Sequence, residues 1–271
     1  MDFIREIRCL TNIVTCKEAI APEPYEQNVR LFSIDYRSEE CLVKGYIAVP
    51  RVVQDPLPAI IFNRGGNREF GLLQPKAVCR LAEKGYIALG SQYRGNAGGT
   101  GVEQFGGKDV ADVLVLIDMC EALPFVRQGG VYMHGHSRGG MMTYLCCAQD
   151  KRIKAAAIGA GISDCFMMYE SREQAMKDVF HELVGGSPAE MPEAFKERSA
   201  VCWAEKIIPP VLICQGTADT RVIPQQAYKM DAELTKAGKQ HKTIIYEGAD
   251  HSLVGTTYID DVIAWFKSYP F

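Results

Sequence analysis

The chain has 271 residues, of which 47% are hydrophobic and 23% are charged, and its formal net charge at pH 7 is −3. This is the composition of an ordinary globular protein, and the length allows one large domain with a single core. The small negative charge gives no electrostatic reason to expect nucleic acid or an anionic membrane as a partner.

The ten cysteines form no Cys-x-x-Cys pair, and most of them stand in apolar runs. This distribution indicates buried free thiols in a reducing compartment rather than a disulfide framework or a zinc site. Residues 1–6 carry acids and start no long apolar segment, so no signal peptide is expected. No stretch approaches the ~20 apolar residues of a membrane span. We therefore expect a cytoplasmic protein that requires no metal or cofactor.

The order of the expected elements predicts the fold class. Residues 1–28 are mixed in character and are interpreted as an N-terminal lead-in without an assigned role. Alternating runs at 31–36 and 42–49 predict an antiparallel hairpin. Short apolar strands and helices then alternate, with strands expected at 59–62, 86–90, 131–134, 153–158, 210–214 and 243–246, and helices at 73–84, 108–123, 141–148, 224–237 and 258–267. This pattern predicts an α/β fold with a mostly parallel central sheet and helices on both faces.

Residues 163–205 interrupt the alternation. They are rich in Met, Glu and Lys, contain Pro188 and Pro192, and predict several short helices. We interpret them as a small helical cap inserted over the edge of the sheet, within a single domain that spans residues 1–271. The larger apolar residues of this segment could line a substrate pocket or form the cap's own core; they are Met167, Met168, Tyr169, Phe180 and Trp203.

A Gly-x-Ser-x-Gly pattern, residues 135–139, lies between an expected strand and an expected helix. In this context the pattern predicts a sharp, strained turn that presents the Ser137 hydroxyl at the carboxyl edge of the sheet. The backbone amide of Arg138, the first of the next helix, would lie where a negatively charged oxygen develops during acyl transfer. Glycine-rich turns before helices also occur without catalysis, so the assignment depends on a partner base.

A serine hydroxyl needs a histidine base that is oriented by a carboxylate. Of the five histidines, His251 is the one that follows an expected strand at the required edge. Asp219 follows the strand at 210–214, and Asp164, which lies one strand earlier, is the alternative carboxylate. Asp250 is too close in sequence to orient His251 and is interpreted as a turn former. The order Ser137, Asp219, His251 is the one expected for an α/β-hydrolase fold.

The second oxyanion donor is expected in the loop after the strand at 59–62, where we assign the amide of Gly66 and keep Gly65 as the alternative. The glycine-rich stretch at 95–107 is not a phosphate loop, because Gly106-Gly107-Lys108 is followed by an aspartate. These residues predict a hydrolase that cleaves an ester or amide bond. The alternative function is a non-catalytic binding or regulatory protein with a hydrolase fold.

Several segments together resemble the catalytic domain of the prolyl oligopeptidase family, which includes acylaminoacyl-peptidase-like enzymes and small esterases. They are residues 45–50, 63–66, 93–99, 107–113, 135–139, 216–219 and 248–252. The resemblance implies a serine hydrolase that acts through an acyl-enzyme on a small molecule or short peptide. Two features depart from the family. Arg64 replaces a frequent histidine and would add charge beside the oxyanion site, and too few residues precede Lys44 to form the family's N-terminal propeller. Peptide and ester substrates therefore both remain open, as does the oligomeric state.

Overall fold

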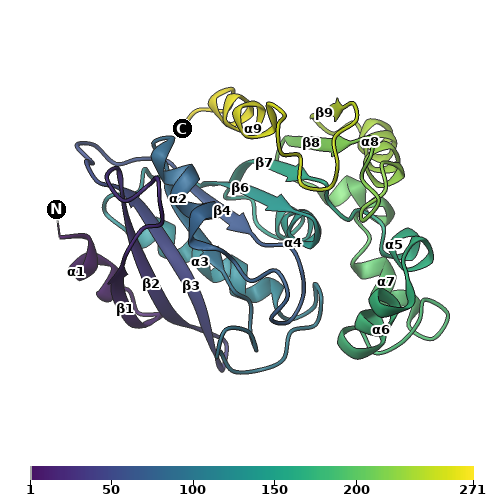
Figure 1. Ribbon diagram of the computed structural model, residues 1–271, viewed down its shortest axis with the longest axis horizontal. Helices are drawn as coiled ribbons and strands as arrows, with labels where there is room; N and C mark the ends of the chain where they lie inside the picture. The colour runs from purple at the N-terminus through teal and green to yellow at the C-terminus, as the bar shows by residue number, and fades with distance from the viewer. Residues whose placement is uncertain (1) are drawn as a thin grey trace.

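A computed structural model describes residues 2–271, and its central feature is a nine-stranded sheet (Figure 1). The strand order across the sheet is β1-β2-β3-β5-β4-β6-β7-β8-β9. The strands are β1 (Ile13–Ala19), β2 (Val29–Ser38), β3 (Cys41–Pro50), β4 (Ala59–Asn63), β5 (Ile87–Ser91), β6 (Val131–His136), β7 (Ile153–Gly159), β8 (Val211–Gly216) and β9 (His241–Tyr246).

Strand direction divides the sheet into two parts. Strands β1, β2 and β3 pair antiparallel with one another, and β3 pairs antiparallel with β5. The six strands β4 to β9 are all parallel. The hairpin and the mostly parallel sheet expected from the sequence are both confirmed. Because parallel strands end at one edge, the loops after β4, β6, β8 and β9 are brought together there.

The N-terminal segment differs from the expected lead-in. It contains the helix α1 (Phe3–Arg8) and the strand β1, which extends the sheet by pairing with β2. Strand β1 has no clear sequence signal, because Cys16 is its one fully buried side chain and no alternation of apolar residues marks it. Helix α1 is held to the body of the protein by Phe3, whose ring meets that of Phe125 edge-on at 5.0 Å.

Helices cover both faces of the sheet. They are α2 (Pro75–Glu83), α3 (Val110–Ala122), α4 (Arg138–Cys147), α8 (Gln225–Lys236) and α9 (Tyr258–Lys267). Successive side chains of a strand face opposite ways, so Ile60 and Tyr132 pack in a core with α2 and α9, whereas Ile61 and Met133 pack in the core of α3 and α4. The near-continuous apolar strands follow from burial on both faces.

Short helices occupy the segment in which a cap was expected. They are α5 (Cys165–Ser171), α6 (Gln174–Leu183) and α7 (Pro192–Glu197), followed by 3₁₀ turns at Ala200–Cys202 and Ala204–Lys206. In Figure 1 these helices lie at the opposite end of the molecule from β1, β2 and β3. The Phe180 ring stacks on Phe195 at 5.1 Å and meets Tyr169 at 5.9 Å, so Phe180 and Tyr169 form the core of this helical segment.

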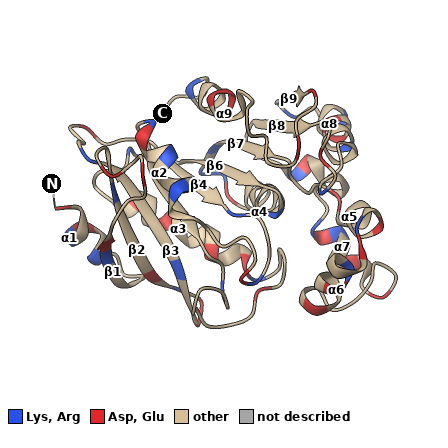
Figure 2. Ribbon diagram, in the orientation of Figure 1, with Lys and Arg blue, Asp and Glu red and all other residues tan. Residues whose placement is uncertain are grey.

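Lys and Arg residues are interspersed with Asp and Glu residues along the chain (Figure 2). All ten cysteines are free, and seven of them are buried. Within residues 2–271, no helix is both long enough and apolar enough to cross a membrane.

Candidate active site

Ser137 stands at the turn between β6 and α4, with φ 59° and ψ −124°. A non-glycine residue adopts this conformation only under strain. The flanking glycines allow the turn to pack: a Cβ on Gly135 would overlap the carbonyl of Gly139, and a Cβ on Gly139 would overlap the carbonyl of Asn63. The local geometry is therefore the strained strand-to-helix elbow that the sequence pattern predicted.

The His251 ring is oriented by a carboxylate. Its Nδ1 lies 2.8 Å from Oδ2 of Asp219. The other carboxylate oxygen of Asp219 accepts hydrogen bonds from the amides of Arg221 and Val222, at 2.8 and 2.9 Å. Burial opposes ionisation of Asp219, but the His251 ring and these two amides outweigh it and lower the carboxyl pKa. The fixed carboxylate leaves Nε2 of His251 as the atom that can exchange a proton.

The two competing acids are engaged elsewhere. The carboxylate of Asp164 bonds to Lys229 at 2.6 Å and caps α5. Asp250 accepts hydrogen bonds from the amide and the hydroxyl of Ser252, at 2.8 and 2.6 Å, as expected of a turn former. Of the three carboxylates considered, Asp219 is the one that bonds to the ring of His251.

Ser137 and His251 line one pocket of about 920 Å³, called here the active-site pocket. Its apolar wall comes from the cap and two loops: Phe105, Ile162, Met168, Met176 and Val179. Charged residues also line it, namely Arg68, Arg138, Arg172, Glu173, Arg221 and Asp250. Among the cap residues singled out from the sequence, Met168 belongs to this wall, whereas Trp203 lines a separate groove. Met176 and Val179 also belong to the wall and were not singled out from the sequence. Their spacing of three residues, which puts them on one face of α6, was the signal that could have identified them.

The loop 64–71 exposes amides to the active-site pocket. Arg64 Nη1 donates to the carbonyl of Gly65 at 3.1 Å. Carbonyl and amide point in opposite directions across a trans peptide, so this bond turns the amide of Gly66 away from Arg64. Across residues 2–271, the amides of Gly66 and Arg138 donate to no protein acceptor, and both residues line the pocket. Both amides are therefore free to bind a substrate oxygen.

Arg64 acts as a clamp on this loop. Its buried guanidinium donates to the carbonyls of five residues at 2.9–3.3 Å: Gly65, Arg68, Phe70, Gly71 and Gln92. The sequence suggested that Arg64 would add charge beside the oxyanion site. Instead, its N–H groups donate hydrogen bonds to backbone carbonyls, and these bonds fix the orientation of the peptide planes of the loop.

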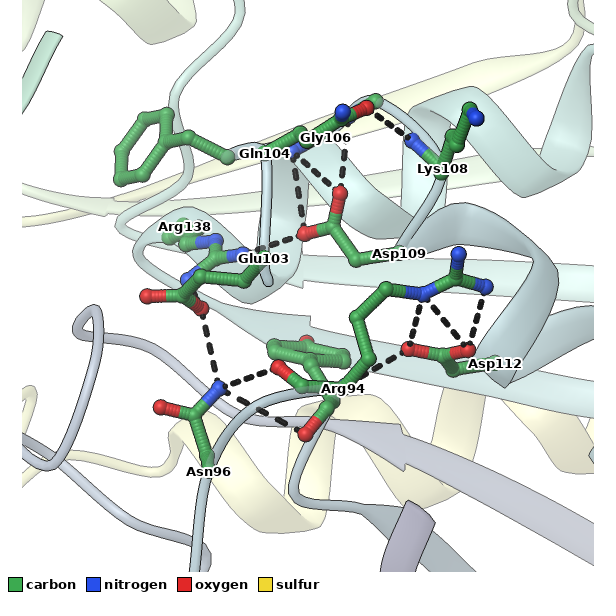
Figure 3. A network of polar contacts seen from close by, with 12 residues as sticks. Arg94, Asn96, Glu103, Gln104, Gly106, Lys108, Asp109, Asp112 and Arg138 are labelled. Atoms are coloured by element: carbon green, nitrogen blue, oxygen red, sulfur yellow. Dashed lines mark hydrogen bonds and ion pairs between the residues drawn. The ribbon is translucent and has the colours of Figure 1, made fainter. Parts of the chain in front are cut away.

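Arg138 joins the elbow to the same loop, because its guanidinium donates to the Gly66 carbonyl at 3.1 Å. The guanidinium also pairs with Glu103 at 2.6 Å and with Asp109 (Figure 3). Glu103 in turn accepts the backbone amide of Arg68, further along the loop. All three charged side chains of this network are at most 3% exposed, and no sequence motif marks either carboxylate as a partner of Arg138. We call Arg138, Glu103 and Asp109 the arginine network.

Buried His134 lies below the elbow in β6. Burial lowers its pKa to about 4, and its Nδ1 lies 3.1 Å from the carbonyl of Ala157. Because the folded pKa lies below the unfolded value of about 6.5, the unfolded chain binds a proton first as the pH falls. We expect the free energy of unfolding to drop by about 1.4 kcal/mol per pH unit between 6.5 and about 4 from this group. Chemical denaturation at several pH values measures it, and NMR titration of His134 near 6.5 in the folded protein would contradict it.

The chain matches the prolyl oligopeptidase family over residues 76–269. It is 31% identical over 231 residues to the uncharacterized peptidase YtmA of Bacillus subtilis, covering 85% of this chain and 89% of that protein. Among solved structures it resembles the acylaminoacyl peptidase of Pyrococcus horikoshii, with a TM-score of 0.77 and 20% identity, over 89% of this chain and 42% of the other. It also resembles an acetyl xylan esterase from Paenibacillus sp. R4, with a TM-score of 0.73 and 15% identity, over 100% and 95% of the two chains.

These likenesses agree with the observed fold. The solved structures share the α/β-hydrolase fold, and the chain spans about two-fifths of the Pyrococcus peptidase. The match to the family covers most of the chain, and the identity with YtmA extends over nearly all of that relative. The chain belongs to the prolyl oligopeptidase family and is a serine hydrolase.

Proposed function

We propose that the protein hydrolyses a carboxylic ester or an amide of a small substrate through an acyl-enzyme on Ser137. The observation that carries the proposal is that the strained Ser137 elbow and His251, whose ring is bonded to Asp219, line one pocket. A serine at its ordinary pKa is a weak nucleophile and needs such a base within reach. The apolar wall of the active-site pocket favours an apolar acyl group.

In the proposed reaction, Ser137 Oγ attacks the carbonyl carbon while His251 Nε2 takes the hydroxyl proton. The carbonyl oxygen becomes negatively charged and is bound by the amides of Gly66 and Arg138. In other enzymes, one such donor stabilises the transition state by ~3–4 kcal/mol. Asp219 stabilises the protonated imidazole. The bond to the leaving group then breaks, and His251 gives its proton to that group. Water, activated by His251, releases the acid in a second round.

Relatives differ in the bond that their names imply, since the Pyrococcus protein is described as a peptidase and the Paenibacillus protein as an esterase. The test compares short-acyl p-nitrophenyl esters with matched aminoacyl p-nitroanilides. We expect turnover of the esters, because an aryl oxide leaves readily. Amide turnover within a few-hundred-fold of ester turnover would identify a site that can protonate an amine leaving group, and would favour a peptidase.

A fluorophosphonate probe tests the nucleophile itself. We expect the probe to label the native protein and peptide mapping to locate the label on Ser137, because only an activated serine reacts at neutral pH. Failure of the native protein both to react with the probe and to hydrolyse the esters would contradict the proposal. It would favour a non-catalytic protein with the same fold.

A further inference from the structure

We propose that a second pocket beside the active site binds the leaving group, and that it selects a leaving group with an apolar body and a carboxylate. The proposal rests on the hydrolytic function proposed above. This leaving-group pocket has a volume of about 540 Å³ and is defined here by Phe62, Leu73, Arg80, Leu253, Val254 and Tyr258. It shares Gly65, Gly71, His136 and Ser252 with the active-site pocket.

The two pockets extend in different directions from the residues that they share. The active-site pocket is walled by the cap helices α5 and α6. The leaving-group pocket is walled by α2, by the ends of β4 and β6, and by residues 252–259, which directly follow His251. A substrate carbonyl bound at Ser137 carries two substituents, so a site with two adjoining pockets can hold one substituent in each.

The chemistry decides which substituent enters which pocket. The acyl part stays attached to Ser137, whereas the leaving group must take a proton from His251 as its bond breaks. His251 itself lines the active-site pocket, but the residues that follow it form a wall of the second pocket. His136, whose ring centroid lies 5.1 Å from that of His251, lines both pockets, so the second pocket adjoins the imidazole. The acyl group accordingly occupies the cap side and the leaving group occupies the α2 side.

The charges that line the leaving-group pocket are unbalanced. Its described lining contains no aspartate or glutamate, whereas the active-site pocket contains Glu173 and Asp250. The guanidinium of Arg64 already donates hydrogen bonds to backbone carbonyls, and burial lowers the pKa of His134 so that its ring is neutral near pH 7. The exposed Arg80 is the cation that remains available, because within residues 2–271 it makes no ion pair and no side-chain hydrogen bond.

Arg80 lies in the lining of this pocket, on α2. An apolar body would pack on Phe62 and Leu73, and a carboxylate would bind the guanidinium of Arg80. The chemical class is an amino acid or hydroxy acid released from its acyl group.

The test uses two aryl esters of one acyl group, phenyl butanoate and 3-carboxyphenyl butanoate. A meta carboxylate changes the acidity of the phenol little, so the two leaving groups differ mainly in charge. The ratio kcat/KM reports the steps up to the release of the phenol, and both esters give the same acyl-enzyme. We expect the native protein to prefer the carboxylated ester by about fivefold, the size of a partly exposed charge-assisted hydrogen bond.

Arg80→Gln should abolish this preference, so that the ratio of kcat/KM for the two aryl esters falls to about one. Lys76→Gln removes one positive charge from an exposed position on the same helix, outside the pocket lining, and should keep the preference. Ala77→Phe places a ring in the pocket lining and should lower kcat/KM for both aryl esters several-fold relative to methyl butanoate, whose leaving group is small.

The outcomes separate this inference from the proposed function. Equal kcat/KM for the two aryl esters in the native protein, or a preference that survives Arg80→Gln, would overturn the leaving-group pocket and leave Ser137-dependent hydrolysis intact. An unchanged ratio of aryl to methyl ester turnover in Ala77→Phe would also overturn it. Absence of any Ser137-dependent turnover of the three esters would overturn the proposed function together with the pocket.

Discussion

Ser137→Ala is expected to lower kcat for ester hydrolysis by about 10⁴- to 10⁶-fold, to the level set by binding and the oxyanion amides alone. The hydroxyl supplies the only bond between enzyme and acyl group in the proposed reaction, so no other pocket residue substitutes for it. Fluorophosphonate labelling should disappear in parallel. Initial rates at saturating p-nitrophenyl ester measure the effect, with a half-buried cap serine outside the pocket lining, Ser187→Ala, as the matched control.

The same position allows a test of the strained backbone. At φ 59° an alanine keeps the unfavourable conformation, whereas a glycine adopts it freely. Ser137→Gly should therefore be inactive like Ser137→Ala but more stable than it, by about 1 kcal/mol in the free energy of unfolding. Residual activity above about 1% in either variant would contradict Ser137 as the nucleophile. Equal stability of the two variants would contradict the strain.

Much of the fold could be predicted because the relevant signals are local. From β2 onward each strand has an apolar run or an alternation, and the helices α2, α8 and α9 each have one apolar face, so the elements follow in the expected order. The candidate site follows from topology: Ser137, Asp219 and His251 each come just after a parallel strand, and such strands end at one edge. The one bond that joins two of them, from His251 to Asp219, spans 32 residues and could be inferred from those positions.

Features that depend on contacts between distant segments could not be predicted in this way. Strand β1 forms by pairing with the edge of β2. Its own residues supply little of the signal, because only one of its side chains is buried. The pairing of Arg138 with Glu103 and Asp109 spans 35 and 29 residues, and nothing in a glycine-rich loop marks those acids as its partners. Likewise, the sequence predicted that Arg64 would add charge beside the oxyanion site, because its carbonyl partners come from loop residues and from Gln92, 28 residues away.

The arginine network carries the second large prediction. Arg138→Met leaves Glu103 and Asp109 buried without the cation that lies between them, and such a loss typically costs 3–5 kcal/mol of stability. It also frees the carbonyl of Gly66, so the amides of the oxyanion loop lose part of their orientation. We expect kcat to fall about 10²-fold with KM little changed, because the lost interaction acts in the transition state. Thermal unfolding and steady-state kinetics measure the two effects.

A milder change keeps this prediction testable if Arg138→Met does not fold. Glu103→Gln retains an oxygen for the Arg68 amide but removes the charge opposite Arg138, and should lower kcat about tenfold while the protein remains folded. The matched control is Glu182→Gln, which breaks the 2.6 Å pair of Arg68 and Glu182 at the surface, where both side chains are about half exposed. An exposed pair contributes roughly 0–1 kcal/mol, so this control should leave stability and kcat nearly unchanged. If Glu103→Gln and Glu182→Gln have equal effects on kcat, the network does not position the oxyanion loop, and its burial serves the fold alone.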